Sequence, residues 1–155
     1  DPVRKANFTG TMRHLLDMQV LPIVNENDTV ATDEITEGLI GDNDTLGAIV
    51  AASLSADLLL LLSDIDGLFT DDPRTAADAR LIPIVPAITP ELVAHAGGKG
   101  TQNGTGGMAT KLKAAQISMD AGVDMVIANG KDPVILYDIV DGKPIGTRFL
   151  GKERI

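Results

Sequence analysis

A glycine-rich segment that runs into a helical pattern gives the clearest signal for phosphate chemistry in this sequence. Gly104 to Gly107 (GTGG) leads directly into Met108 to Lys111 (MATK). Glycines let backbone amides approach an anion closely, and a helix start adds N–H groups with partial positive charge. Lys111 would supply a full charge. The spacing differs from that of P-loop NTPases. A lone segment of this kind is more often a flexible loop followed by a solvated lysine.

Two motifs rich in acid and amide side chains could form a polar site. Asn25-Glu26-Asn27-Asp28 follows an apolar run, and Gly41-Asp42-Asn43-Asp44 precedes a segment with helical spacing. In open parallel sheets, ligands bind beyond the carboxyl ends of strands, where the first motif would lie. The simpler alternatives are a turn for the first motif and helix capping by Asp42 or Asp44 for the second, with Asp44 at the expected cap position.

A fourth motif, Ser63 to Thr70 (SDIDGLFT), follows a run of leucines. Taken locally, its Asp66-Gly67 pair is typical of a turn after a strand. His14 and His95 stand alone, and no His/Asp/Glu spacing indicates a zinc site. We therefore expect no metal site built from protein side chains alone.

The elements that would position these motifs follow from hydrophobic patterning. Three continuously apolar runs predict strands that are buried on both faces; these are Val20–Val24, weakened by Pro22, Leu58–Leu62 and Met125–Ala128. Three segments have helical spacing: Asn7–Met18, Asp44–Leu54 and Met108–Ala121. The alternation predicts an α/β fold, a three-layer αβα sandwich with a mostly parallel sheet.

The motifs share a position relative to these elements. Each falls at the end of a predicted strand or at the start of the next helix, which is the same edge of a parallel sheet. One crevice at this edge could use them all. Thr70–Arg80 and Gly97–Gly107 are polar or glycine-rich and are expected to be surface loops.

Composition limits the classes of function. The 155 residues suit one domain, and the few aromatic residues require an aliphatic core. The formal net charge of −9 opposes nonspecific binding to nucleic acid or anionic membranes. The absence of cysteine fits a reducing compartment, and no apolar run is long enough to cross a bilayer. We expect a cytoplasmic protein without nucleic-acid or membrane partners.

Five segments, taken in order, resemble the amino-acid kinase family and, within it, the glutamate 5-kinases. They are LPIVNENDTV, GDNDTLGA, ADLLLLLSDIDGLFTDDPR, GTGGMATKLKAA and AGVDMVIANG. The resemblance extends from about Asn7 to Phe149. It implies ATP-dependent phosphorylation of the L-glutamate side-chain carboxylate to γ-glutamyl phosphate, the first step of proline biosynthesis. It also implies Mg²⁺ bound with ATP, a homo-oligomer, and proline as a feedback inhibitor.

The resemblance assigns roles to residues by position. It implies that glutamate is held by Asn25, Asp28 and Asn43. It implies that the nucleotide is held by Ser63 and Asp64 and by the loop residues Thr105, Gly106, Gly107, Met108, Ala109, Thr110 and Lys111. Lys111 would contact the transferring phosphoryl group, and Asp44 would organise the active-site lysines. These two are the expected catalytic residues.

The sequence also departs from the family pattern. The strand, lysine-containing glycine loop and serine-containing loop that open the family domain are missing, as is an accessory C-terminal domain. We therefore expect residues 1–155 to be a partial domain, its C-terminal nucleotide-binding half, which lacks activity when isolated. Two alternatives remain open: the kinase portion of a bifunctional pyrroline-carboxylate synthase, and a noncatalytic nucleotide-binding or assembly module.

Overall fold

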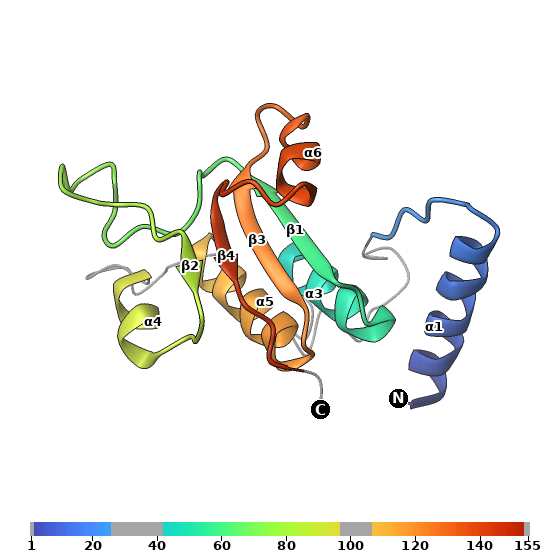
Figure 1. The fold of residues 1–155 in the computed structure, drawn as a ribbon. Helices are drawn as coiled ribbons and strands as arrows, with labels where there is room; N and C mark the ends of the chain where they lie inside the picture. The colour runs from blue at the N-terminus through green and yellow to red at the C-terminus, as the bar shows by residue number, and fades with distance from the viewer. Residues whose placement is uncertain (1, 26–41, 97–106, 154–155) are drawn as a thin grey trace.

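A mixed, mostly parallel sheet forms the centre of the computed structural model, which describes residues 2–25, 42–96 and 107–153. Within these residues the sheet has the order β1-β3-β4-β2 (Figure 1). Its strands are β1 (Leu58–Ser63), β2 (Ile84–Val85), β3 (Asp124–Asn129) and β4 (Thr147–Phe149). β1 pairs with β3 and β2 with β4 in parallel, whereas β3 and β4 are antiparallel.

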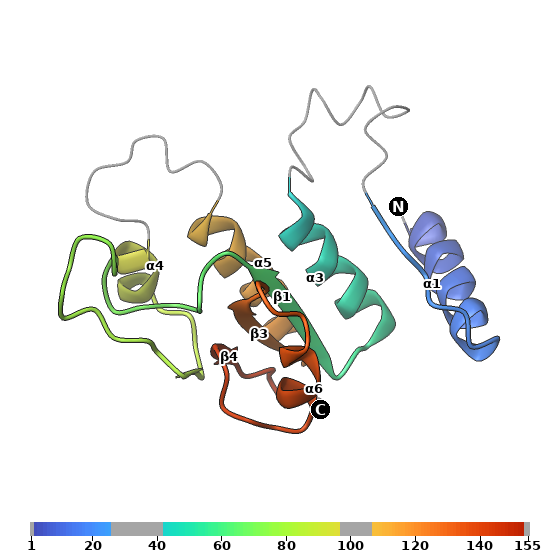
Figure 2. The ribbon, with the colours of Figure 1, turned by 90° about the horizontal axis from the view of Figure 1, so that it is seen from above.

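Helices cover both faces of this sheet, as the α/β sandwich requires. The described helices are α1 (Pro2–Asp17), α3 (Asn43–Leu54), α4 (Pro90–Ala96), α5 (Met108–Asp120) and α6 (Ile135–Val140). Figure 2 shows α3, α4 and α5 on one side of the sheet and α6 on the other. The three-layer αβα arrangement is confirmed. None of the described helices is long and apolar enough to span a membrane.

The central strand β3 is buried on both faces, as its continuous apolarity predicts. Met125 and Ile127 belong to the core cluster that includes Leu112 of α5. Val126 and Ala128 alternate with them and pack in a second cluster with Ile139 of α6. The period of two along the strand therefore divides the core into two layers.

Helices α3 and α5 pack side by side on one face of the sheet through small residues. Ala48 of α3 and Ala114 and Ala115 of α5 have no exposed surface. Side chains this small let the two helix backbones approach closely, so the first turns of the helices can share a site. The predicted bounds of both helices are confirmed to within one residue at each end.

The prediction of a strand at Val20–Val24 is wrong. The segment belongs to no strand, and Leu21 and Ile23 are 84% and 93% exposed. A strand needs a neighbour for its backbone hydrogen bonds, and β1 pairs within the described residues only with β3. Pro22, which has no N–H group, further weakens any ladder here. Pro22 and Val24 instead line a pocket against α3.

Helix α1 begins at Pro2, earlier than the predicted Asn7. Proline is favourable in the first turn of a helix because its missing N–H would have no partner there. The buried residue of α1 is Met12, and the rest of the helix is largely exposed. Hydrophobic periodicity therefore could not mark the true start.

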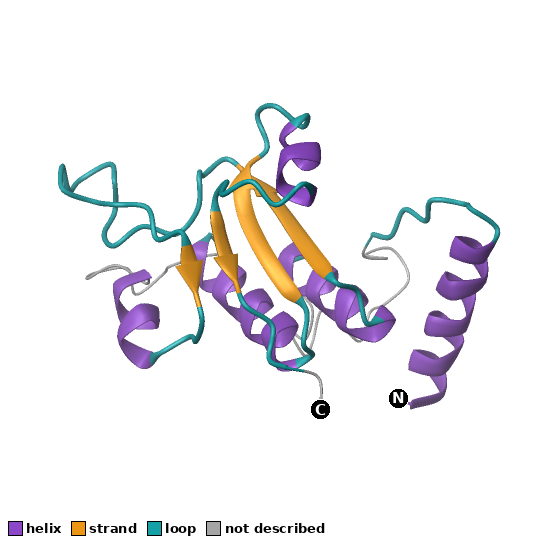
Figure 3. Cartoon of the chain, in the orientation of Figure 1, coloured by secondary structure: helices purple, strands orange, loops and turns teal. Residues whose placement is uncertain are grey.

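The segment Thr70–Arg80 is a surface loop, as predicted, and its base is closed by hydrogen bonds. The Thr70 amide donates to the Arg80 carbonyl at 2.9 Å, and the Arg80 amide donates to Thr70 Oγ1 at 3.0 Å. Within the loop, hydrogen bonds from Arg74 lower the pKa of the Asp72 carboxyl. Four short elements, β2, β4, α4 and α6, were not predicted because they are too short to show a period (Figure 3).

Candidate active site

The first turns of α3 and α5 lie toward the edge of the sheet where β1 and β3 end. Each helix is joined to the following strand by a short connection, from Leu54 to Leu58 and from Asp120 to Asp124. Such helices run opposite to their strands, so their N-termini return to the carboxyl edge (Figure 1). This is the edge at which ligands bind in open α/β sheets.

An ion pair joins the two helix starts. Lys111 Nζ donates to Asp44 Oδ2 at 3.0 Å, and Thr110 Oγ1 lies 3.2 Å from the same oxygen. The side chains of Lys111 and Asp44 are only 11% and 23% exposed. A partly buried ammonium held by a carboxylate has a fixed direction, which a solvated surface lysine lacks. The structure thus brings together the two expected catalytic residues, which are 67 positions apart in the sequence.

Asp42, not Asp44, caps α3. The Thr45 amide donates to Asp42 Oδ1 at 2.6 Å, and Thr45 Oγ1 donates to Asp42 Oδ2 at 3.0 Å. The backbone of Asp42 is extended, with φ −158° and ψ 145°, as a cap residue requires. Of the two aspartates that the sequence offered as caps, the structure selects Asp42, and the preference for Asp44 is wrong. Because Asp42 satisfies the helix start, Asp44 is available to Lys111.

The start of α5 provides backbone donors without a side-chain cap. Gly107 is the N-cap residue and makes no side-chain capping hydrogen bond, whereas Thr110 Oγ1 donates to the Gly107 carbonyl at 3.1 Å. The first N–H groups of an α-helix have no partner within the helix. Among the described residues, a Cβ atom at Gly107 would meet nothing within 4 Å. The predicted nucleotide residues Met108, Ala109 and Thr110 form this first turn.

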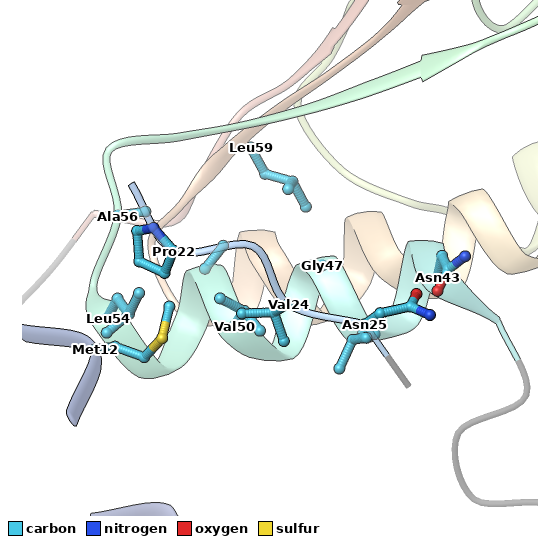
Figure 4. A pocket seen from close by; sticks show the side chains of 12 residues that line it. Met12, Pro22, Val24, Asn25, Asn43, Gly47, Val50, Leu54, Ala56 and Leu59 are labelled. Carbon is cyan, nitrogen blue, oxygen red and sulfur yellow. The ribbon is translucent and has the colours of Figure 1, made fainter. Parts of the chain in front are cut away.

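Two of the predicted glutamate residues, Asn25 and Asn43, line one pocket of about 490 Å³. Figure 4 shows the two amides together at one end of the pocket, with Met12 and Leu54 at the other end. The remaining lining is largely apolar, from residues such as Val24, Val50 and Leu59. Only the amide end has the chemistry to bind a charged amino acid. It lies at the start of α3, next to Asp44 in the sequence.

Ser63 and Asp64, predicted to hold the nucleotide, form the turn that leaves β1. Ser63 Oγ donates to Asp64 Oδ1 at 3.1 Å. Asp64 and the following Asp66 are exposed at the sheet edge. The far end of this turn is anchored to β4, because the Leu68 amide donates to the buried Thr147 Oγ1 at 2.8 Å. Thr147 Oγ1 in turn donates to the Ile82 carbonyl at 2.7 Å.

Sequence reasoning missed Asn129, the last residue of β3. Its side-chain amide donates to Asp66 Oδ1 at 2.8 Å, which links the loops after β3 and β1. The sequence showed only an Asn-Gly pair, which is typical of a turn. The parallel register, which places Ser63 opposite Asn129, is what would have revealed it.

Three predicted site residues, Asp28, Thr105 and Gly106, lie outside the described residues. Among the residues that the structure does describe, no three His, Cys, Asp or Glu side chains gather as a metal site would require.

A sequence model of the amino acid kinase family matches residues 1–129. The chain belongs to this family. Lys111 and Gly107 lie at a helix start at the carboxyl edge of its αβα sheet, a position at which proteins commonly bind phosphate groups.

Individual relatives within this family are glutamate 5-kinases. The chain is 53% identical over 149 residues to the glutamate 5-kinase of Clostridium tetani, covering 96% of this chain and 55% of the relative. It is 52% identical over 147 residues to that of Deinococcus radiodurans, covering 95% of this chain and 40% of the relative. The chain thus spans about half the length of these curated relatives, or less.

Solved structures support the fold. The carbamate kinase of Giardia lamblia bound to AMP-PNP has a TM-score of 0.54 at 23% identity, covering 72% of this chain and 36% of that one. The uridylate kinase of Archaeoglobus fulgidus has a TM-score of 0.52 at 20% identity, covering 70% of this chain and 46% of that one. At these identities the likeness concerns the fold alone.

Proposed function

We propose that this chain is part of an enzyme that transfers the γ-phosphoryl group of ATP to the side-chain carboxylate of L-glutamate. The products are γ-glutamyl phosphate and ADP, and the reaction is the first step of proline biosynthesis. The proposal rests mainly on one observation: the ion pair of 3.0 Å between Lys111 and Asp44, at the start of α5 and beside the glycine-rich segment. The glutamate 5-kinases that share about half of its sequence support the choice of acceptor.

The chemistry asks the protein for alignment and charge stabilisation. The glutamate carboxylate is ionised near neutral pH and attacks the γ-phosphorus directly, so no general base is needed. A new bond forms from a carboxylate oxygen to phosphorus, and the bond from phosphorus to the leaving oxygen of ADP breaks. Negative charge spreads over the phosphoryl oxygens during transfer. A lysine and helix N–H groups fixed in advance are suited to stabilise this charge.

In this proposal Lys111 neutralises the transferring phosphoryl group, and Asp44 holds its ammonium in place. The backbone amides of Gly106, Gly107 and the residues up to Lys111, together with Thr105, would surround the phosphates. Ser63 and Asp64, at the end of β1, would hold the rest of the nucleotide. Of these positions, the described ones from Gly107 to Lys111 and at Ser63 and Asp64 belong to the same edge of the sheet.

Glutamate would bind at the amide end of the α3 pocket. The side-chain N–H groups of Asn25 and Asn43 are suited to carboxylate oxygens. Asp28 is proposed to pair with the substrate's ammonium group, as the family resemblance implies.

Mg²⁺ would enter with ATP, bound chiefly to its phosphates, and would offset charge on the phosphate oxygens. Mg²⁺ commonly uses only one or two protein carboxylates in such sites. The exposed carboxylate of Asp64 at the sheet edge fits this role. We also propose that the enzyme is a cytoplasmic homo-oligomer inhibited by proline, and that residues 1–155 form the C-terminal nucleotide-binding half of its amino-acid kinase domain.

The test is an acceptor assay on the intact protein with ATP and Mg²⁺. Hydroxylamine traps acyl phosphates as hydroxamates, so glutamate should give a hydroxamate that neither N-acetylglutamate nor aspartate gives at a comparable rate. ATP binding without any glutamate-dependent hydroxamate would support a noncatalytic nucleotide-binding module instead. Preference for N-acetylglutamate would assign the chain to a different acceptor.

A further inference from the structure

The loops that leave β1 and β3 are joined to each other directly at the proposed nucleotide site. In the parallel ladder, Ser63 lies opposite Asn129 at the ends of the two strands. The Gly130 amide continues the contact past the strand ends, because it donates to the Ser63 carbonyl at 2.7 Å. One end of the Ser63–Asp66 turn is therefore held by the backbone that follows β3.

The other end of this turn is held by a side chain. Asn129 Nδ2 donates to Asp66 Oδ1 at 2.8 Å, and Asn129 Oδ1 accepts from the Lys131 amide at 3.0 Å. Both ends of the Asn129 amide group are used, which fixes its orientation. If the group were turned over, its oxygen would face the Asp66 carboxylate and its NH₂ would face the Lys131 N–H, and both contacts would be repulsive.

Gly130 allows the two strand ends to lie this close. A Cβ atom at position 130 would lie 2.9 Å from Leu62 Cβ and 3.5 Å from the Leu62 carbonyl carbon. The first distance is too short for two carbon atoms, so a side chain here would push the strand ends apart. The Asn129-Gly130 pair thus combines a specific donor with the space that its approach needs.

We propose that Asn129 is a positioning residue for the nucleotide site, which acts by holding Asp66 and, through it, the Ser63–Asp64 pair. Ser63 and Asp64 lie between the two contacts, so their backbone is restrained before any ligand arrives. A preordered loop loses less conformational entropy on binding, which strengthens affinity. The inference deepens the proposed function and depends on the assignment of Ser63 and Asp64 to the nucleotide.

The test is ATP binding by the intact protein, measured by calorimetry with Asn129→Ala. We expect the Kd for ATP to rise on the order of 3- to 10-fold, the range that corresponds to loss of one hydrogen bond. The affinity for glutamate and the melting temperature should stay near those of the parent protein. The matched control is Gln116→Ala. Gln116 Nε2 also donates to a carboxylate, Asp120 Oδ2 at 3.0 Å, but near the far end of α5. This control should leave the Kd for ATP unchanged.

A reciprocal exchange separates positioning from a general structural effect. Asn129→Asp alone places two carboxylates together and should weaken ATP binding at least as much as Asn129→Ala. Adding Asp66→Asn restores an amide-to-carboxylate hydrogen bond with donor and acceptor exchanged, and should recover most of the lost affinity. The proposal is overturned if Asn129→Ala binds ATP within about twofold of the parent, or if the exchange recovers nothing. An intact protein that binds ATP but does not phosphorylate glutamate would refute the proposed reaction and leave this inference standing.

Discussion

Lys111 has its direction set by its surroundings on α5 and α3. It follows the first turn of α5. Leu112, Ala115 and Met119, further along the same helix, are buried and fix the helix against the core. Its ammonium then meets Asp44 at 3.0 Å. A charge aimed before the substrate binds needs little reorganisation during the reaction, which is the condition for effective transition-state stabilisation.

Lys111→Ala in the intact protein should therefore lower kcat and kcat/KM together, by about 10²–10³. Lys111→Arg should not restore full activity, because a planar guanidinium cannot occupy the position of a compact ammonium. The control is Lys113→Ala, which removes an exposed lysine two residues further along α5 and should leave turnover unchanged. A Lys111→Ala enzyme with near-normal kcat and only a raised KM for ATP would make the lysine a ground-state contact.

Asn43 tests the proposed glutamate site. Asn43→Ala should raise the KM for glutamate by about 10-fold or more, since a hydrogen bond to a charged group contributes about 1.5–3 kcal/mol, and should change the KM for ATP much less. Steady-state kinetics with each substrate varied in turn provide the measurement. Equal changes in both constants would show that the substitution disturbs α3 rather than the substrate.

At the scale of elements, the short strand β4 anchors the far end of the turn that leaves β1. Its first residue, Thr147, is fully buried and connects Leu68 with Ile82 through one hydroxyl group. Gly67 lies against this hydroxyl, because a Cβ atom there would come within 2.6 Å of Thr147 Oγ1. The turn after β1 is thus positioned by β4, although the two strands are not neighbours in the sheet.

Thr147→Val keeps the shape of this side chain and removes its hydrogen bonds. Leaving the buried Leu68 N–H and the partly buried Ile82 carbonyl without partners should lower the free energy of unfolding, by about 1–3 kcal/mol for a fully buried group and less for a partly buried one. Urea denaturation of the intact protein should show a lower midpoint with an unchanged m-value. Thr147→Ser, which keeps the hydroxyl, should lose less. If the valine and serine variants were equally stable, the hydroxyl would have no role in anchoring the turn.

Two glycines allow a matched test of how closely β4 approaches β3. Gly146 and Gly142 both have left-handed φ angles, of +71° and +84°. A Cβ atom at position 146 would lie 2.0 Å from the Ile127 carbonyl oxygen, whereas one at position 142 would meet nothing within 4 Å. Gly142→Ala should lower the free energy of unfolding by about 1–2 kcal/mol, which is the cost of a left-handed φ for a residue with a Cβ atom.

Gly146→Ala should cost more, about 2–5 kcal/mol, because the clash with the β3 backbone adds an overpacking term. The difference between the free energies of unfolding of the two variants, measured in the same buffer, gives the cost of this clash. Similar values would mean that β4 can move away from β3 without loss.

At the scale of the whole molecule, charged contacts fasten the C-terminal segment to the sheet and to α5. Arg148 pairs with Asp124 at 2.7 Å, and the Gly151 amide donates to the same carboxylate at 2.8 Å. Lys152 forms an ion pair with Asp120 at the end of α5. The hydrogen bond from Lys152, aided by one from Gln116, lowers the pKa of the Asp120 carboxyl from its ordinary value of 3.8.

The lowered pKa of Asp120 predicts in which direction the stability of the folded protein changes with pH. A carboxyl whose pKa is lower in the folded state contributes stability above its unfolded pKa, and this contribution is lost as the pH falls through the folded pKa. Asp120→Asn should therefore lower the melting temperature slightly near neutral pH and not at all well below the folded pKa. The effect should be small and should shrink in high salt, because the pair is exposed. An equal loss at all pH values would assign the effect to the hydrogen bonds rather than to the charge.

The sequence by itself determined the features that depend on local pattern. The apolar runs of β1 and β3 predicted burial, and the helical spacing of Met108–Ala121 predicted α5. Burial and helical period depend on the order of residues along the chain, so both can be predicted before the fold is known. The positions of Ser63, Asp64 and Lys111 at one sheet edge followed from the same alternation of strand and helix.

Only the tertiary structure decided which of these segments meet. Among the described residues it left Val20–Val24 without a strand partner, and it gave the α3 cap to Asp42. It also joined Asp44 to Lys111 and Asp66 to Asn129, pairs separated by 67 and 63 positions. A strand, an ion pair or a cross-loop hydrogen bond needs a specific neighbour in space, and that neighbour is selected by sheet order and helix packing rather than by residues nearby in the chain.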